Sequence, residues 1–186
     1  MPMSTPARPR TRTLLISALL AALLAVSAWI TVPVGTVPVT AQTLTLAVIV
    51  LICPPRQAAA LLTLYLALGA AGLPVFSGGR AGVATLVGPT GGYLIGFLIG
   101  ATLGAAVRRP LPAHRPGVSD TLALTAMFAG VYVTGTTWLA YSTGMGATAA
   151  IAAGVAPFVL LDGVKAAVAV VLARRLRAAG LVDATA

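Results

Sequence analysis

Two oppositely charged side chains, Asp162 and Lys165, lie within the last apolar stretch of the sequence, from about Ala149 to Ala173. A charge near the centre of a bilayer costs about 2.5 to 3.5 kcal/mol on insertion scales, so such residues tend to be paired, inward-facing and functional. Their i, i+3 spacing places them on one helix face, where they can form a local ion pair. The pattern favours a polar ligand site over the alternative, an ion pair that only holds helices together.

Further polar side chains are expected at the same level of the membrane. The helix from Asp162 to Arg174 is about 18 Å long, which places Asp162 around or just outside the midplane and opens the site to the outside. Gln42 begins one apolar stretch from that side, Tyr93 begins another, and Trp138 ends a third. The Gln42 amide needs hydrogen-bond partners in an apolar bundle, whereas Trp138 is equally consistent with an interfacial aromatic belt.

A long glycine-rich loop from Leu73 to Gly92 carries Arg80, the only basic residue predicted on the outer side. Its Gly78-Gly79 pair and the segment from Gly88 to Gly92 favour two backbone turns, so we expect the loop to cover a cavity as a lid. A second long loop is expected from Thr31 to Gln42. No GxxxxGK[ST] motif is present, and the chain is not expected to bind ATP by itself.

Composition places these residues in a membrane protein. The 186 residues are 59% hydrophobic and only 8% charged, whereas a soluble domain carries about 25% charged residues. Lys and Arg number 12 against 3 acidic residues, and we interpret the net charge of +9 as a cytoplasmic-side signal and not as a nucleic-acid interface. The single Cys53 excludes an internal disulfide and matches no zinc motif, so no metal or other cofactor is expected.

Several apolar stretches are candidates to cross the bilayer, which needs about 20 helical residues per span. Two short stretches flank Pro54-Pro55 and form either one kinked span or two short ones. Two separate spans place nearly all basic residues on the inner side, whereas one kinked span divides them between both sides. The apolar stretches are 14–30, 43–53, 58–72, 93–107, 122–141 and 149–173.

The charge bias therefore predicts an all-α integral membrane protein with six transmembrane helices and both termini in the cytoplasm. Residues 1–186 form one domain, with cytoplasmic tails at 1–12 and 174–186 and long extracellular loops that cap a ligand pocket. We expect a multi-pass protein of the cell membrane, surrounded by lipid. The stretch 14–30 is expected to remain as a span and not to be cleaved as a signal peptide.

The titratable residues do not indicate an enzyme. The only histidine, His114, lies in a predicted cytoplasmic loop, so a membrane serine has no base beside it. Aspartyl chemistry needs two neighbouring carboxylates, and Asp162 has no acidic companion, since Asp120 and Asp183 are predicted on the cytoplasmic side. Catalysis is therefore not expected.

Small residues follow one face of two predicted helices. A four-residue glycine repeat runs from Gly92 to Gly104 and predicts close helix packing. Ala18, Ala22 and Ala25 form a comparable smooth face on the first helix. Alanine is common throughout this chain, so this face reflects either composition or a docking surface for a partner.

Five segments, spread from the second predicted helix to the sixth, carry a family resemblance. They are PVTAQT (38–43), GAAGLPVFSGG (69–79), VGPTGGYLIGF (87–97), GTTWLA (135–140) and GVAPFVLLDGVKAA (154–167). Through them the chain resembles the BioY family, the biotin-specific S components of energy-coupling factor (ECF) transporters. The segments include Gln42, Tyr93 and the Asp162–Lys165 pair, so the resemblance covers the candidate site as well as most of the chain.

The resemblance implies a six-helix membrane protein that captures biotin from outside and delivers it inward. It implies partners as well: a transmembrane coupling (T) subunit and two cytoplasmic ATPase subunits, with the first helix docking through Ala18, Ala22 and Ala25. Some family members occur without a dedicated module, so the partner remains open for this chain.

We therefore predict a biotin pocket. The ureido group of biotin offers N–H donors beside a carbonyl acceptor, which match one carboxylate and one ammonium, and its carboxylate needs donors. The predicted ligand-binding residues are Gln42, Tyr93, Asp162 and Lys165, with Arg80 and Trp138 as further candidates. Two alternatives stay open: an S component for a different vitamin, and a non-transporting structural or assembly membrane protein.

Overall fold

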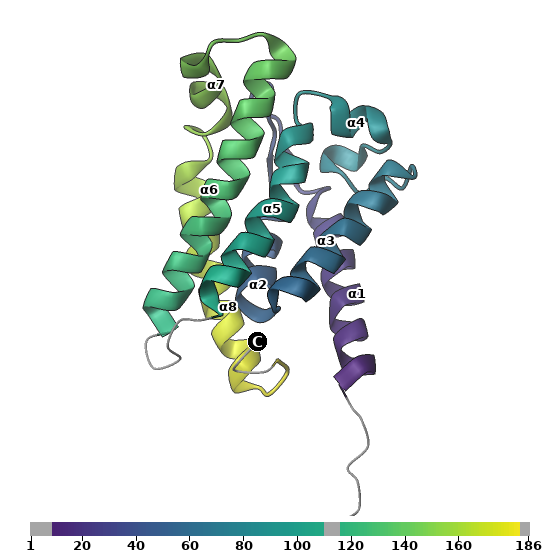
Figure 1. Ribbon diagram of the computed structural model, residues 1–186, viewed down its shortest axis with the longest axis vertical. Helices are drawn as coiled ribbons and strands as arrows, with labels where there is room; N and C mark the ends of the chain where they lie inside the picture. Colours follow the sequence, from purple (N-terminus) through teal and green to yellow (C-terminus); the bar gives the residue numbers. More distant parts are fainter. Residues whose placement is uncertain (1–8, 110–115, 183–186) are drawn as a thin grey trace, which may run out of the picture.

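The computed structural model describes residues 9–109 and 116–182 as a helical bundle with one two-stranded hairpin (Figure 1). His114, Asp183 and tail residues 1–8 lie outside the described residues. The helices are α1 Pro9–Ser27, α2 Gln42–Ile52, α3 Pro55–Ala70, α4 Val83–Val87, α5 Gly91–Arg108, α6 Pro116–Thr143, α7 Ala147–Gly154 and α8 Val159–Ala178, with a 3₁₀ turn, η1, at Ser77–Gly79. α1 begins at Pro9, so the residues predicted as the end of an N-terminal tail are helical.

The chain reverses direction between α2 and α3, at Pro54. α2 ends beside the last turns of α8, where the Arg177 guanidinium donates a hydrogen bond to the Leu51 carbonyl at 2.6 Å. α3 starts beside α1, where Gln57 Nε2 donates to Ser17 Oγ at 2.8 Å, and then runs back along α5 (Figure 1). Pro54 is extended, with φ −66° and ψ 156°, and proline favours the start of a helix and not its continuation. The two short apolar stretches therefore form two helices.

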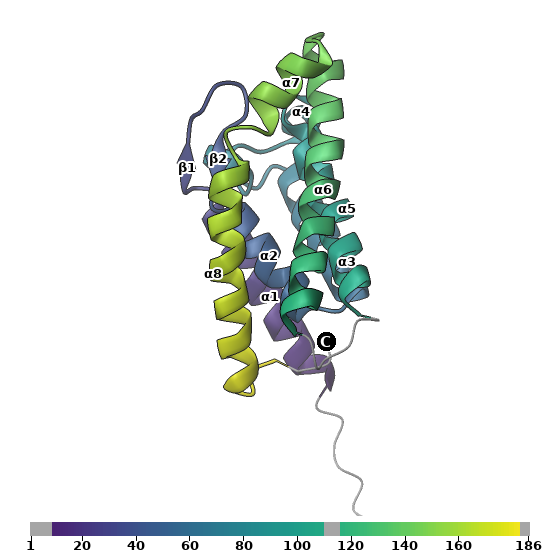
Figure 2. The same ribbon diagram turned by 90° about the vertical axis from the view of Figure 1, so that its left-hand side faces the viewer.

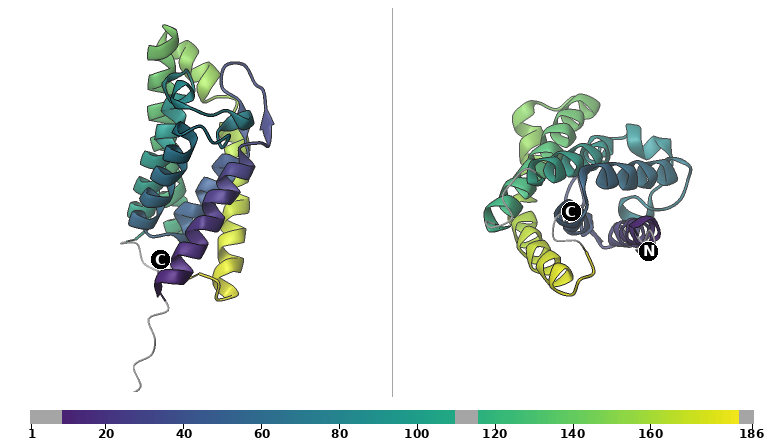
Figure 3. Two further views of the ribbon diagram at one scale, coloured as in Figure 1. Left: turned by 90° about the vertical axis from the view of Figure 1, so that its right-hand side faces the viewer. Right: turned by 60° about the horizontal axis from the view of Figure 1, so that its bottom comes forward.

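The two ends of the bundle differ in their residues and in their backbone. The start of α1 and the end of α8 lie at the same end (Figure 3), where the Arg12 guanidinium donates to the Gly180 carbonyl at 2.7 Å. We call this the Arg-rich end. The opposite end, which we call the loop end, carries the β1–β2 hairpin, α4 and α7 (Figure 2). The Arg-rich end includes Arg12, Arg108, Arg109, Arg174, Arg175 and Arg177.

The two long segments predicted as loops contain short regular elements at the loop end. In the first, β1 (Thr31–Val32) pairs with β2 (Val39–Thr40) as an antiparallel hairpin. In the second, η1 and α4 replace part of the predicted loop. Gly78 and Gly79 have φ values of +67° and +74°, a left-handed conformation that glycine adopts at little cost. The Gly78-Gly79 pair thus makes the turn that its sequence predicts.

The last apolar stretch is not one straight helix. α7 and α8 meet at a bend of 45°, and Pro157 lies in the break between them. Proline has no N–H to donate and clashes with the preceding turn, so a continuous helix from residue 149 is excluded. Asp162 consequently lies in the first turn of α8 and not in mid-helix.

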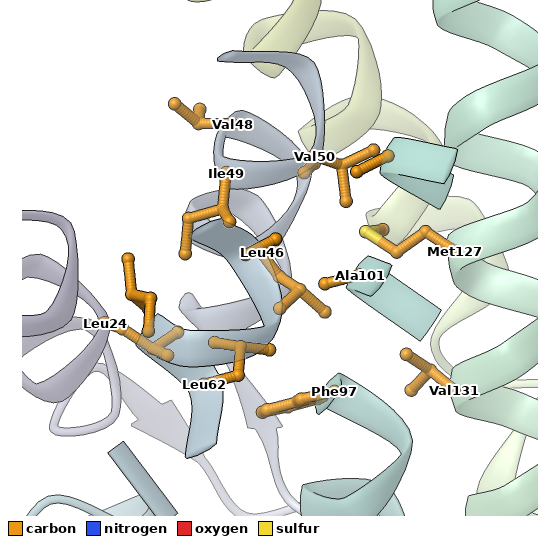
Figure 4. Packing of buried hydrophobic residues seen from close by; sticks show 14 of the residues in the cluster. Leu24, Leu46, Val48, Ile49, Val50, Leu62, Phe97, Ala101, Met127 and Val131 are labelled. Carbon is orange, nitrogen blue, oxygen red and sulfur yellow. The ribbon is translucent and has the colours of Figure 1, made fainter. Parts of the chain in front are cut away.

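The core centres on α2, which other helices surround. Leu46, Ile49 and Val50 of α2 are almost fully buried, and Figure 4 shows them between Leu24 on one side and Met127 on the other. The structure confirms the packing role predicted for the glycine repeat of α5. Cβ atoms on Gly96, Gly100 and Gly104 would collide with α6. Close approach of helix backbones is what such repeats allow in membranes.

Helix length and apolarity identify fewer spans than six. Among the described residues, Gly91–Arg108 and Gly117–Thr143 are long and apolar enough to cross a bilayer, and the bent α7–α8 pair is a third candidate. α2 has 11 residues, or about 16 Å of helix, against about 30 Å of hydrocarbon. The arrangement is that of an apolar helical membrane protein, and six crossings remain a prediction.

Candidate ligand-binding site

A pocket opens at the loop end, between α2, α5, α6 and α8 and beneath the two loop segments. The space between its atoms, including the open space at its entrance, is about 600 Å³. Its apolar walls include Pro38, Phe76, Leu94, Phe97, Val131 and Phe158. Such walls suit a ligand with apolar rings or an alkyl chain, held in place by a few polar groups.

Asp162 is the polar centre of the pocket, and its side chain connects three helices. Its Oδ1 accepts hydrogen bonds from Thr43 Oγ1 of α2 at 2.7 Å and from Lys165 Nζ at 2.9 Å. Its Oδ2 accepts from the Tyr132 hydroxyl of α6 at 2.7 Å. The residue is only 3% exposed, so these bonds compensate the cost of burying the carboxylate.

Lys165 forms the predicted i, i+3 ion pair with Asp162 and has two further partners. Its ammonium donates to the Thr40 carbonyl at 2.8 Å and to Thr43 Oγ1 at 2.9 Å. Thr43 therefore accepts from Lys165 while it donates to Asp162, which joins the three side chains in one ring of hydrogen bonds. All three N–H donors of the ammonium are engaged in this arrangement.

Gln42 and Tyr93 also line the pocket, but each is anchored to another part of the protein. Gln42 Nε2 donates to the Tyr65 hydroxyl at 2.7 Å, and Tyr65 in turn donates to the Val75 carbonyl at 2.7 Å. The Tyr93 hydroxyl donates to the Gly154 carbonyl at 2.9 Å. These bonds hold the loop after α3 and the end of α7 against the helices, so both residues shape the pocket as well as line it.

Arg80 lies at the pocket and Trp138 does not. Arg80 is exposed, and its Nε donates to the Ser77 carbonyl at 3.1 Å. Its other guanidinium donors make no hydrogen bond within the described residues. Trp138 instead donates from Nε1 to the Gly88 carbonyl at 2.8 Å and packs on Gly92, outside the pocket lining. The structure therefore gives Trp138 a role in holding the loop before α5.

Sequence reasoning missed Thr43, Tyr132 and Tyr65. Thr43 follows Gln42 directly in the sequence, and its position next to a predicted site residue is the signal that could have identified it. Tyr132 lies in the middle of the apolar stretch 122–141, where a buried phenol needs a partner. Only the packing of α6 against α8 identifies that partner as Asp162.

The predicted docking residues lie on the outer surface of α1 and only partly share one environment. Ala18 and Ala22 are exposed, whereas Ala25 is half-buried and packs against the core. Large apolar neighbours surround them, with Leu15, Leu19 and Leu23 exposed by 60%, 70% and 49%. This face therefore consists of small residues between exposed leucines.

Comparison with known proteins identifies the family. The model of the BioY family matches residues 3–181, nearly the whole chain. The chain belongs to the BioY family. This confirms the resemblance carried by the five segments, and membership of this transporter family confirms that the chain is not an enzyme.

Several curated BioY relatives match most of the chain. "Biotin transporter BioY2" of Lactococcus lactis is 36% identical over 158 residues, covering 82% of this chain and 83% of its own length. "Probable biotin transporter BioY" of Pyrococcus horikoshii is 38% identical over 160 residues, covering 86% and 93%. "Biotin transporter BioY" of Thermotoga maritima is 35% identical over 173 residues, covering 89% and 96%.

A solved structure shares the fold. The "S-component for biotin from an ECF-type ABC transporter" superposes with a TM-score of 0.83, at 24% identity, over 94% of this chain and 95% of its own. The similarity extends across nearly the whole bundle. It confirms the predicted class of fold, an all-α membrane protein of the S-component type.

Proposed function

We propose that this BioY-family chain is a biotin-binding membrane subunit that captures biotin at the loop end and delivers it inward with an ECF energy-coupling module. The observation that carries the proposal is the Asp162–Lys165–Thr43 hydrogen-bonded ring at the base of an apolar pocket. Relatives that cover most of the chain are named biotin transporters. The loop end is the extracellular side, and the protein spans the cell membrane.

The ring of polar groups suits the ureido head of biotin. A carboxylate oxygen can accept more than one hydrogen bond, and among the described residues Asp162 Oδ2 accepts one, from the Tyr132 hydroxyl. An incoming N–H can therefore bind Asp162 without displacing a partner. Lys165 has no free donor, so it reaches the ureido carbonyl only by releasing Thr40 or Thr43.

The carboxylate of biotin lies toward Arg80 in this proposal. Gln42 donates to Tyr65 and Tyr93 donates to Gly154, whereas Arg80 donates only from its Nε within the described part of the chain. A guanidinium with unused donors is suited to a carboxylate. Biotin would then extend from Asp162 at the base of the pocket to Arg80 at its mouth.

Titration of purified protein with biotin tests the ligand. We expect saturable one-to-one binding in calorimetry that a large excess of thiamine or riboflavin does not displace. Displacement by either vitamin would support an S component for a different substrate. A folded, monodisperse protein that binds no vitamin would support a structural or assembly role and would refute the proposal.

The orientation of biotin has a separate test with a matched ligand pair. Arg80→Gln should lower the affinity for biotin about tenfold, the usual effect of losing one charged hydrogen bond. The same substitution should leave the affinity for biotin methyl ester unchanged, because that ligand lacks the carboxylate. Equal weakening of both ligands would contradict the placement of the carboxylate at Arg80.

Coupling to an ECF module is tested on the outer face of α1. Ala18→Leu and Ala22→Leu place bulk on exposed positions and should reduce co-purification with the T and ATPase subunits while biotin binding persists. Val171→Leu, on the exposed face of α8, is the control. Unchanged co-purification would show that this face of α1 is not the docking surface.

A further inference from the structure

A second hollow, the α6–α8 groove, runs along the outer surface of the bundle between α6 and α8. Its open space is about 1,000 Å³, and its lining is mainly apolar. A Cβ on Gly163 would touch no atom within 4 Å, so the groove is open at that point. Its walls include Leu124, Phe128, Ala129, Gly163, Ala167 and Val170.

The dimensions of the groove match one leaflet of a bilayer. On α6 its lining extends from Thr121 to Tyr132, or about 16 Å of helix. Half of a hydrocarbon core is about 15 Å. Toward the loop end the lining includes Val159, Tyr132 and Asp162, and the last two are hydrogen-bonded at 2.7 Å. An extended acyl chain fits this length.

A cation lies about one helical turn beyond the other end of the groove lining. Arg174 follows Val170 by one helical turn, on the same face of α8. Across the groove, Gly117 precedes Thr121 by one turn, and a Cβ on Gly117 would lie 3.8 Å from Arg174 Nη2. Arg174 is exposed and forms no hydrogen bond or ion pair with the described residues. The guanidinium is therefore available where an apolar groove meets the Arg-rich end.

We propose that the α6–α8 groove binds one anionic phospholipid, with an acyl chain between the two helices and the phosphate on Arg174. Apolar lining and a guanidinium beyond one end complement the two parts of that lipid. Arginine binds phosphate through two parallel hydrogen bonds, and basic sites between membrane helices on the cytoplasmic side bind anionic headgroups. Toward the loop end the acyl chain lies beside Tyr132 and Asp162, which also line the ligand pocket.

Native mass spectrometry of delipidated protein, with added phosphatidylglycerol or phosphatidylcholine, tests this site. We expect one phosphatidylglycerol per chain to be retained in preference to phosphatidylcholine. Arg174→Gln should reduce phosphatidylglycerol retention about fivefold, the effect of one basic residue near a charged membrane surface. Arg56→Gln is the matched control, because Arg56 is exposed at the start of α3, away from the groove, and should change nothing.

Filling the groove gives an independent test of the acyl-chain position. Ala167 is exposed and lines the groove, so Ala167→Phe places a ring there and should abolish selective retention. Circular dichroism and a monodisperse elution profile check that each variant is folded. If Ala167→Phe is not folded, lipid retention by Arg174→Gln and Ala129→Phe tests the site instead.

Two outcomes overturn the proposal. Equal phosphatidylglycerol retention by the wild type, Arg174→Gln and the groove-filling variants would show that the lipid is not bound in this groove. A wild-type dimer that Ala167→Phe dissociates, with lipid retention unchanged, would assign the groove to a second copy of the chain. The readout is lipid retention, so failure here leaves the biotin proposal untouched.

Discussion

The molecule buries a carboxylate at each end of the bundle and surrounds the two differently. Asp162, at the loop end, accepts two neutral hydroxyls and one ammonium and lines a pocket. Asp120, at the Arg-rich end, lies 3.0 Å from Arg108 Nε and 3.8 Å from Arg177 Nη2. Asp120 is 1% exposed, and its Oδ2 has no hydrogen-bond partner among the described residues.

The difference suits Asp162 to exchanging hydrogen-bond partners with a ligand and suits Asp120 to joining helices. Hydroxyl groups give up a hydrogen bond at modest cost, whereas separating buried opposite charges leaves an uncompensated charge. The Asp120 cluster joins α5, α6 and α8, and Arg177 extends it to α2 through the Leu51 carbonyl. We infer that Asp162 serves a ligand and that Asp120 holds the helix ends together.

The largest expected effect is on stability, from Asp120→Ala. Removing this carboxylate leaves Arg108 and Arg177 without their buried counter-charge and should lower the free energy of unfolding by about 3 to 5 kcal/mol. Unfolding with dodecyl sulfate in mixed micelles measures it. Arg175→Ala, an exposed residue, is the control and should change stability by less than about 0.5 kcal/mol. A loss equal to that of the control would remove the distinction between the two ends.

Asp162→Asn should act mainly on binding. The amide keeps the shape but loses the charge and presents an N–H in place of one acceptor, so we expect biotin affinity to fall about 100-fold, or about 2.7 kcal/mol. Calorimetry of the folded variant measures the affinity, and Lys165→Ala should weaken binding in the same way. Unchanged affinity in both variants would exclude this pair as the binding site.

Tyr132→Phe is a finer test of the same site. The substitution removes only the hydroxyl that Asp162 Oδ2 accepts, so biotin affinity should fall about fivefold as the carboxylate loses its orientation. Tyr141→Phe, with Tyr141 81% exposed, should have no effect in the same titration. A fall as large as that of Asp162→Asn would mean that Tyr132 contacts the ligand directly.

Trp138→Phe should have the smallest effect. It removes the hydrogen bond to the Gly88 carbonyl and should cost about 1 kcal/mol of stability, with biotin affinity reduced at most about threefold through the loop. Unfolding and titration of the same preparation separate the two quantities. A loss of binding free energy larger than the loss of unfolding free energy would indicate that Trp138 contributes to the ligand pocket.

Much of the fold was predictable because its signals are local. Pro54 and Pro55 mark a break that the charge bias assigns to two separate helices, and the glycine repeat from Gly92 to Gly104 predicts the kind of close helix packing seen between α5 and α6. The break at Pro157 was missed, although a proline inside a long apolar stretch is itself a warning. The hairpin pairing of Thr31–Val32 with Val39–Thr40 was also missed, since strands of two residues carry no periodic signal.

The site shows the same division between local and distant information. The i, i+3 spacing of Asp162 and Lys165 predicts their ion pair, which forms at 2.9 Å. The roles of Thr43 and Tyr132 depend on α2 and α6, far away in the sequence. Trp138 was placed at the correct end of the bundle, but its indole points to the loop before α5 and not into the pocket.

The sequence by itself determined the membrane environment, the family and the charged pair, because hydropathy, motifs and helical spacing are properties of neighbouring residues. Only the tertiary structure decided which hydroxyls surround Asp162, where Trp138 points and that an apolar groove runs between α6 and α8. Those features depend on where one helix meets another. A hydrogen bond or a groove between distant segments exists only after their packing has fixed both sides.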